Sequence, residues 1–549
     1  MSLLLVLGCW LTCLVNDPAS PLDQQQGEPP VASFDVLHYD LSMNFNLPQK
    51  TFTGRVVIHV RALTSLTEMT VDAASATLVI DSVRTRGGAA AFHHASDLLS
   101  VQWSQPVAAQ SEFDLTISYH GSSTYSGQYD GGGVYFISPS RLATISEPNF
   151  ARTWWPCVDR PSDKATAAMT ISVPESLTAV SNGVLRSVTR HSGTATYSWE
   201  TDYPIATYLV SAAAAVYREY SEPYRRADGT DMKIVYYLYP EDEERGKVDF
   251  QNTKKILEFF SRRFCEYPFI REKFGFAEVD GNTTMEHQTL CSIQKDLIRG
   301  DRSSELTLLH ETAHHWWGDL ITPINWKHTW LSEGFATYAE ALYLEEAAGK
   351  DSSRKYVERW MDAEPGTYAG SVIGKTDTAF WDAFAPRVYN KGAIVLHMLR
   401  AVVGDTIFFA IMRNYLNDPK LRYGNAATDD FIAECERTSG KNLKWFFHEW
   451  VYASADSVDR PAYEYDWTTN RNGSSFDVRV FLNQTTAGKL LFRMPMTVTL
   501  LSAKSQQTFP VVDSLASQTF SFVTVEPPTD VLIDKEHDVF KVLKRAEKR

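Results

Sequence analysis

The stretch from His310 to His314, with the sequence HETAH, and the later Glu333 constrain this chain of 549 residues more than any other feature. Two histidines four residues apart on a helix lie on one face, one turn apart, and can bind the same zinc ion. Glu311 lies between them, faces the expected position of a water on the metal and suits a general base. The eighteen residues between His314 and Glu333 allow a second helix to return a third ligand. Three protein ligands leave a fourth position for water, which is typical of a catalytic zinc site.

The neighbours of this pattern argue against the alternative, a surface helix with two solvated histidines. Buried histidines and a buried glutamate without partners would be costly. Ser332, directly before Glu333, is expected to cap the helix that carries the third ligand. Apolar residues surround the zinc pattern on most sides and predict a buried helix: Leu306, Leu308, Leu309, Trp316, Trp317 and Leu320.

Length and charge exclude several classes of protein. The chain is too long for one hydrophobic core, so three or four domains are expected. Its net charge is −14, and no long basic run is present, which argues against nucleic-acid binding. No apolar run reaches the roughly eighteen residues that a transmembrane helix needs. Four cysteines follow the first twenty residues, none in a C-x-x-C pair. They are too few for a disulfide framework and are not expected to bind zinc, although one disulfide is compatible with them.

The first twenty residues are expected to be an export signal or lipoprotein leader. Residues 2–15 form a short apolar run before polar Asn16 and Asp17, although the usual basic start is missing. Residues 6–9, ending in Cys9, match a bacterial lipoprotein cleavage box, which would place a lipid anchor on Cys9. We therefore expect an exported protein, in the periplasm, at the cell surface or secreted. The alternatives are a mis-set start or a buried strand in a cytoplasmic protein.

Hydrophobic periodicity divides the remainder of the chain. Residues 21–30 are rich in Pro and Gln and are expected to be a linker. Alternating patterns predict an antiparallel β domain over residues 31–225. Helical spacing predicts a mainly α zinc domain over residues 226–455, and short strands predict a β-sandwich over residues 456–549. The predicted fold class is therefore multidomain α+β.

Two local segments carry further expectations. Residues 275–280 are expected to form an edge strand beside the zinc helix, whose free edge could pair with an extended peptide. Trp154 and Trp155 follow a segment that is not strand-like and are expected to anchor a loop against another domain. Glu147, in the same segment, could project into a cleft.

These residues together resemble the gluzincin zinc aminopeptidases, the family of aminopeptidase N and leukotriene hydrolase. The similarity covers nearly the whole chain. It rests on HHWWGD at residues 314–319 and WLSEGFA at 330–336, with WPCVD at 155–159 and the Tyr389-x-Lys391-Gly392 string as further landmarks. The resemblance implies an N-terminal β saddle, a thermolysin-like catalytic domain, a C-terminal β-sandwich and one zinc ion per chain. The large C-terminal helical domain of many relatives is not expected here.

The resemblance also implies selection of a free N-terminus. The family signature Gly-x-Met-Glu-Asn matches residues 283–287, where Met285 and Glu286 are kept while Thr283 and His287 replace the glycine and asparagine. Glu286 is expected to bind the α-ammonium of the substrate, because a carboxylate near the metal selects a cationic terminus that internal peptide bonds lack. The substitutions are expected to affect the main-chain role of this segment and the preference for the first residue.

Four more residues receive roles from the same resemblance. Thr284 and Met285 are expected to contact the substrate, and Glu147 is expected to be a second amine-binding acid, although Ile145 replaces the glutamine usual two residues before it. Tyr389 matches the tyrosine that stabilises the oxyanion, whereas without Lys391 and Gly392 it would be interpreted as a core tyrosine.

Glu340 lies seven residues after Glu333, on the same helical face. It is expected to support a zinc ligand from behind, and the alternative is a solvated helix glutamate.

The sequence thus predicts a zinc-dependent aminopeptidase that acts on peptides with a free N-terminus. Glu311 would take a proton from water and return it to the leaving amine. A zinc endopeptidase is the nearest alternative and would cleave N-acetylated peptides equally well. Epoxide hydrolysis, known in one branch of the family, has no positive sign in the sequence. An inactive peptide-binding module would lack a ligand or the base, and all four residues are present.

Overall fold

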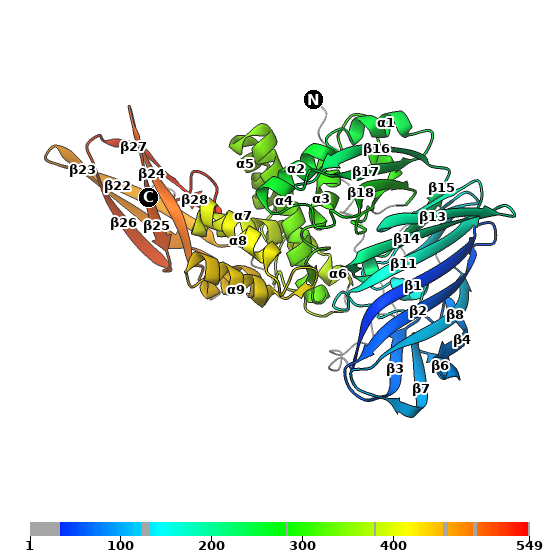
Figure 1. The fold of residues 1–549 in the computed structure, drawn as a ribbon. Helices are drawn as coiled ribbons and strands as arrows, with labels where there is room; N and C mark the ends of the chain where they lie inside the picture. Colours follow the sequence, from blue (N-terminus) through cyan, green and yellow to red (C-terminus); the bar gives the residue numbers. More distant parts are fainter. Residues whose placement is uncertain are drawn as a thin grey trace.

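The computed structural model of the chain describes residues 33–122, 132–281, 284–377, 380–453, 459–486 and 491–546. The expected leader with Cys9, the expected linker and Thr283 lie outside these residues. A β-rich N-terminal part, a helical middle part and a C-terminal β part follow one another along the molecule (Figure 1), which confirms the predicted fold class. No helix of the described ranges combines the length and the apolar character needed to cross a bilayer.

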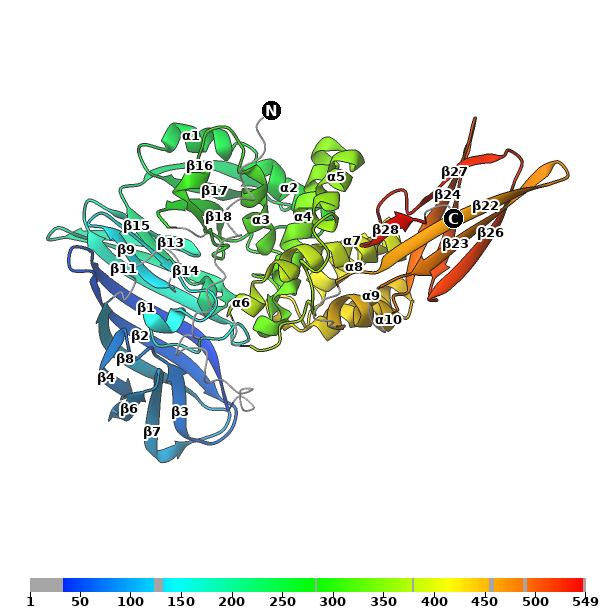
Figure 2. The same cartoon turned by 180° about the vertical axis from the view of Figure 1, so that it is seen from behind.

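The N-terminal part is built on an eight-stranded sheet, seen from both sides in Figures 1 and 2. Its order is β13-β14-β11-β1-β2-β8-β4-β5. All neighbours are antiparallel except β1 and β11, which are parallel. Side chains alternate between buried and exposed along these strands, as a half-buried sheet requires. The bounds are β1 (Phe34–Asn46), β2 (Thr51–Ala62), β4 (Leu78–Thr85), β5 (Gly88–Ala89), β8 (Glu112–Ser122), β11 (Ala165–Pro174), β13 (Val184–His191) and β14 (Thr194–Ile205).

Two smaller sheets complete this part, with orders β3-β7-β6 and β12-β15-β10-β9. Trp154 and Trp155 are fully buried, and Trp155 packs edge-on against Tyr39 while Trp154 donates a hydrogen bond to Ser146. The hydrophobic cluster that contains them also includes residues of the middle part, such as Tyr237 and Trp326, so their expected role as an anchor against another domain stays a prediction. The bounds are β3 (Leu66–Asp72), β6 (Ala91–Ala95), β7 (Leu98–Val107), β9 (Gly133–Ser138), β10 (Arg141–Ile145), β12 (Thr178–Ser181) and β15 (Ala212–Ala215).

The middle part begins with a four-stranded sheet of order β16-β17-β18-β19. Its strands are β16 (Arg218–Arg225), β17 (Asp231–Leu238), β18 (Lys273–Val279) and β19 (Cys291–Gln294). Two expectations are corrected. The expected boundary at residues 225/226 would leave β16 in the N-terminal β domain. In the structure β16 pairs with β17, so it belongs to the sheet of the middle part. The strand expected at an edge, β18, is an interior strand with parallel neighbours on both sides, so its backbone is not free to pair with a peptide.

Helices make up the remainder of the middle part. The zinc pattern lies on α3 (Glu305–His314), which packs on α4 (Trp330–Ala348). The other elements are α1 (Glu243–Asp249), α2 (Thr253–Arg263), α5 (Lys350–Met361), α6 (Phe380–Ala383), α7 (Gly392–Val403), α8 (Asp405–Asn417), α9 (Thr428–Ser439), α10 (Lys444–Phe447), β20 (Thr322–Pro323) and β21 (Asn425–Ala426).

A close crossing of α4 and α7 brings two parts of the site together. A methyl group on Gly334 would lie only 3.0 Å from the Cα of Gly392, so both positions need glycine for this approach. Glu333 precedes one of these glycines. A π-helical turn, Arg387–Lys391, precedes the other and carries Tyr389. The crossing therefore sets the distance between Glu333 and Tyr389.

The C-terminal part is the expected β-sandwich. One sheet has the order β26-β23-β22-β28 and the other has the order β25-β24-β27. Inward side chains such as Val480 and Leu482 from the first sheet and Val498 and Val531 from the second are buried in the same hydrophobic cluster. The bounds are β22 (Ala462–Asn472), β23 (Ser475–Gln484), β24 (Met494–Ser502), β25 (Gln506–Asp513), β26 (Ser517–Thr524), β27 (Pro528–Ile533) and β28 (Val542–Arg545).

Candidate metal centre

Three side chains from α3 and α4 converge on one point. Glu333 Oε2 lies 3.2 Å from Nε2 of His310 and 3.4 Å from Nε2 of His314. Zinc ligands at about 2.0–2.1 Å in tetrahedral geometry lie about 3.3 Å from one another. The separations to Glu333 thus match those of a tetrahedral zinc site. The residues predicted as ligands are the ones that meet here.

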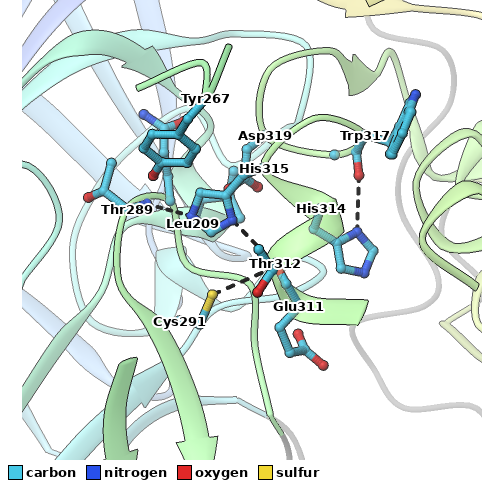
Figure 3. Close-up of polar contacts among 12 residues, drawn as sticks. Leu209, Tyr267, Thr289, Cys291, Glu311, Thr312, His314, His315, Trp317 and Asp319 are labelled. Atoms are coloured by element: carbon cyan, nitrogen blue, oxygen red, sulfur yellow. Dashed lines mark hydrogen bonds and ion pairs between the residues drawn. The ribbon is translucent and has the colours of Figure 1, made fainter. Parts of the chain in front are cut away.

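The other nitrogen of each histidine is fixed by a contact behind the site. His310 Nδ1 lies 2.9 Å from Glu340 Oε1. His314 Nδ1 lies 2.9 Å from Ser332 Oγ. It also lies 3.1 Å from the carbonyl oxygen of Trp317, and Figure 3 shows this second contact. These contacts direct both Nε2 atoms toward the common point, as supporting residues do in metal sites.

Ser332 does not have the role expected from the sequence. Helix α4 begins at Trp330, so Ser332 lies inside the helix rather than at its cap. A buried serine beside His314 uses its hydroxyl for the histidine and for the carbonyl of Trp317. Ser332 directly precedes a predicted ligand, so the sequence marked it as a residue near the site. The group that its hydroxyl contacts depends on where the helix starts.

The charges of the site favour a cation. Burial alone would lower the pKa of His314, but the carboxylates of Glu286 and Glu333 raise it to about 9. Burial would raise the pKa of Glu333, but the two histidines lower it to about 2. A buried, carboxylate-rich group of donors attracts positive charge, which a divalent metal ion supplies. The residues present therefore fit a zinc ion.

Glu311 lies beside the metal point and is held by Thr284, which the sequence assigned to the substrate instead. Its side chain is buried, and Oε1 accepts a hydrogen bond of 2.9 Å from the hydroxyl of Thr284. Thr284 was expected to contact the substrate. The structure instead places its hydroxyl on the predicted base, and a threonine at the unspecified position of the family signature gave no indication of this contact.

Glu286 follows in a segment that runs beside the sheet edge. Met285 exchanges both backbone hydrogen bonds with Ser292 of β19, at 2.9 and 2.8 Å, and its side chain is buried in the core. Met285 therefore anchors the segment, and its expected contact with the substrate stays a prediction. The carboxyl of Glu286 is buried, and burial raises its pKa to about 7, with Glu333 and Glu311 adding to the effect.

Glu147 and Tyr389 complete the cluster. Burial raises the pKa of Glu147, and its strongest charged neighbour is Glu286. The two predicted amine-binding acids are thus brought together from different domains. The ring of Tyr389 stacks parallel to that of His310, with centroids 6.3 Å apart. Burial raises the pKa of Tyr389 and keeps its phenol protonated, so that it can donate a hydrogen bond.

Two further histidines beside the site were not assigned a role by the sequence. His315 follows the ligand His314 and accepts a hydrogen bond from the backbone of Thr289 (Figure 3). His287, which replaces the asparagine of the family signature, is fully buried and contacts Ser292 through Nδ1 at 2.8 Å. Burial lowers the pKa of both imidazoles to about 3, so both are neutral.

Comparison with protein families gives two matches. The N-terminal domain of peptidase family M1 matches residues 36–209, and the peptidase family M1 domain matches residues 248–450. Among curated proteins, the chain is 28% identical over 360 residues to "Aminopeptidase N" of Streptomyces lividans, which covers 61% of this chain and 41% of that protein. It is 25% identical over 466 residues to "Aminopeptidase M1" of Arabidopsis thaliana, which covers 78% of this chain and 51% of that protein. The chain thus spans about half the length of these relatives or less.

Solved structures share the fold. Aminopeptidase A of Legionella pneumophila, solved with aspartic acid, matches with a TM-score of 0.80 at 18% identity, over 95% of this chain and 61% of that one. An M1 zinc metallopeptidase from Deinococcus radiodurans matches with a TM-score of 0.67 at 24% identity, over 77% of this chain and 94% of that one.

Proposed function

The chain belongs to peptidase family M1, and we propose that it is a zinc-dependent aminopeptidase that releases N-terminal residues from peptides. The observation that carries the proposal is the pairing of Glu286 with Glu147 beside the three zinc ligands. Glu286 is buried and Glu147 is partly buried, and both lie close enough to Glu333 for its charge to raise their pKa values. Two neighbouring carboxylates, one buried and one partly buried, favour a ligand that brings its own positive charge, such as an α-ammonium group.

His310, His314 and Glu333 would hold the zinc ion, which supplies Lewis acidity to a water and to the scissile carbonyl. Glu311 accepts the proton of the attacking water and returns it to the nitrogen of the leaving peptide. The phenol of Tyr389 donates a hydrogen bond to the carbonyl oxygen as negative charge develops there, a contact that can contribute about 3 kcal/mol. Glu286 and Glu147 bind the α-ammonium, so that the first peptide bond is the one presented to the base.

The experiment that tests this proposal uses matched reporter peptides with free and with acetylated N-termini. Purified protein is assayed with bound zinc, after treatment with a chelator and after zinc is restored. We expect rapid cleavage of the free peptide, little cleavage of the acetylated one, and loss of activity that zinc reverses. Equal cleavage of both peptides would instead identify an endopeptidase. Zinc binding without any turnover would identify a peptide-binding module.

We also propose that the protein is exported, which the apolar run of residues 2–15 supports. Cys9 would carry a lipid anchor if the leader is processed as in lipoproteins. Fractionation of cells that express the full chain tests this, with the Cys9→Ser variant as comparison. Recovery of the wild type in membranes and of the variant in the soluble exported fraction is expected. Recovery of both in the cytoplasm contradicts export.

A further inference from the structure

The turn that follows Glu286 is held in an unusual conformation. Residues 287–290 close a turn in which the N–H of Leu290 donates to the carbonyl of His287 at 2.9 Å. Thr289 has a φ of +68°, in the left-handed region that β-branched residues avoid. Its side chain is fully buried. A threonine persists in this conformation only where the surrounding contacts hold it there.

One of these contacts comes from the zinc helix. The N–H of Thr289 donates to Nε2 of His315 at 3.0 Å. Because Nε2 accepts, the ring carries its proton on Nδ1. Nδ1 faces the carbonyl oxygen of Glu311 at 3.4 Å and the carboxylate of Asp319 at 3.7 Å. His315 thus joins the turn after Glu286 to the backbone of the predicted base, as Figure 3 shows.

A contact on the same side adds to this connection. The thiol of Cys291, at the start of β19, lies 3.7 Å from the same carbonyl of Glu311 (Figure 3). Met285 and Ser292 pair across the base of the loop. The segment from 285 to 292 is therefore attached at two places: Thr289 of the turn contacts His315, and Cys291, near the Met285–Ser292 pair, contacts Glu311 of α3.

The N-terminal domain holds the opposite side of the turn. Nδ2 of Asn182 donates to the carbonyl of Gln288 at 2.7 Å, and the N–H of Gly183 donates to Oγ1 of Thr289 at 2.8 Å. Oδ1 of Asn182 accepts from the backbone of Ser211 at 2.8 Å, so the amide is fixed within its own domain. Asn182 is buried. The turn is thus held between two domains.

We propose that His315 and Asn182 are positioning residues that set the separation between Glu286 and the zinc helix, and thereby the peptide bond that is cut. This inference rests on the proposed function. One residue of extended peptide spans about 3.5 Å, and a displacement of about 1 Å at an active site can reduce the rate about a hundredfold. The carboxylate that binds the terminus therefore has to be fixed relative to the base. The double attachment through Thr289 and Gln288 supplies that constraint.

The first test compares His315→Leu with His315→Gln. Leucine cannot accept the hydrogen bond from Thr289, whereas the amide oxygen of glutamine can. For His315→Leu we expect retained zinc, a KM for the free peptide raised about tenfold and a similar fall in the preference over the acetylated peptide. His315→Gln should recover most of the preference. Equal behaviour of the two variants, or an unchanged preference in His315→Leu, would overturn the role of His315.

The second test moves the substitution to the other domain, away from the metal. Asn182→Ala removes the donor to Gln288 and should also reduce the preference for the free terminus, with zinc content unchanged. Asn425→Ala is the matched control, because its amide also joins the two domains, at 2.7 Å to the carbonyl of Pro161, without touching this turn. A fall in melting temperature alone for Asn182→Ala, with KM and preference equal to those of the control, would show a purely structural contact.

Assays of the wild-type protein distinguish a failure of the proposed function from a failure of the positioning role. If the wild type cleaves free and acetylated peptides equally, the proposed function is wrong and the positioning role falls with it. If the wild type prefers the free peptide and all the variants keep that preference, the aminopeptidase function stands and the positioning role is wrong.

Discussion

Glu340 Oε1 lies 2.9 Å from Nδ1 of His310, on the side of the imidazole opposite the metal point. The second oxygen of Glu340 accepts from the hydroxyl of Tyr356. Glu340 and the ligand Glu333 project from the same face of α4, seven residues apart. One helix thus supplies a ligand and the carboxylate that orients another ligand, and the alternative of a solvated glutamate is excluded.

Removal of this carboxylate should weaken metal binding. For Glu340→Ala we expect the affinity for zinc to fall about 10–100-fold, because the imidazole of His310 loses its fixed orientation. Titration in metal buffers measures this. Glu346→Ala is the control, since Glu346 is on the same helix but is exposed and pairs with Arg262. Equal affinities in the two variants would contradict the role of Glu340.

Loss of the base should separate metal binding from turnover. Glu311→Gln keeps the shape of the side chain and removes the proton acceptor. We expect wild-type zinc content and a fall in kcat of about 10²–10⁴-fold, the contribution that general base catalysis typically makes. Metal analysis and steady-state kinetics on the same preparation provide the measurement. Full activity in this variant would refute the assignment.

The hydroxyl of Thr284 should matter through its contact with Glu311. Thr284→Val removes the 2.9 Å hydrogen bond but keeps the shape, and Thr284→Ser keeps the bond. Hydrogen bonds to charged groups contribute about 1.5–3 kcal/mol, so kcat should fall about 10–100-fold in the valine variant and much less in the serine variant. If both variants lower KM or kcat equally, Thr284 acts on the substrate, as the sequence suggested.

Neutralising Glu286 should affect the free terminus specifically. Glu286→Gln removes the charge that pairs with the α-ammonium and should lower kcat/KM for a free peptide about a hundredfold, since truncated buried charge pairs typically cost several kcal/mol. Slow cleavage of the acetylated peptide should remain unchanged or rise. A parallel loss for both peptides would indicate damage to the metal site, and zinc content checks this.

The crossing of α4 and α7 should be sensitive to a single methyl group. In Gly334→Ala the added Cβ would lie 3.0–3.2 Å from backbone atoms of Gly392 and Val388. Overpacking of this kind costs about 1–3 kcal/mol, which exceeds the gain of about 1 kcal/mol in helix propensity. We expect a lower melting temperature and a lower kcat, because the turn with Tyr389 moves away from Glu333. A raised melting temperature with full activity would contradict this.

Several parts of the fold and site were predictable because they depend on local periodicity. The spacing of His310 and His314 places them on one helical face wherever that helix lies, and the distance of seven residues between Glu333 and Glu340 does the same on α4. Alternation along the strands predicted the two β parts, and the helical period predicted the middle. The position of β18 was not predictable, because a fully buried strand gives the same apolar pattern whether it has one neighbour or two.

Local sequence patterns indicated the three residues that meet at the metal point, the expected base and the carboxylate of Glu286 that we propose binds an amine. How these groups are held follows from the packing of distant segments. This packing directs Ser332 to His314 and Thr284 to Glu311, and it places the turn after Glu286 between His315 and Asn182. A side chain's neighbours within one helix or strand follow from its spacing in the sequence. Its partners on other elements depend on where domains meet, and no local pattern records that.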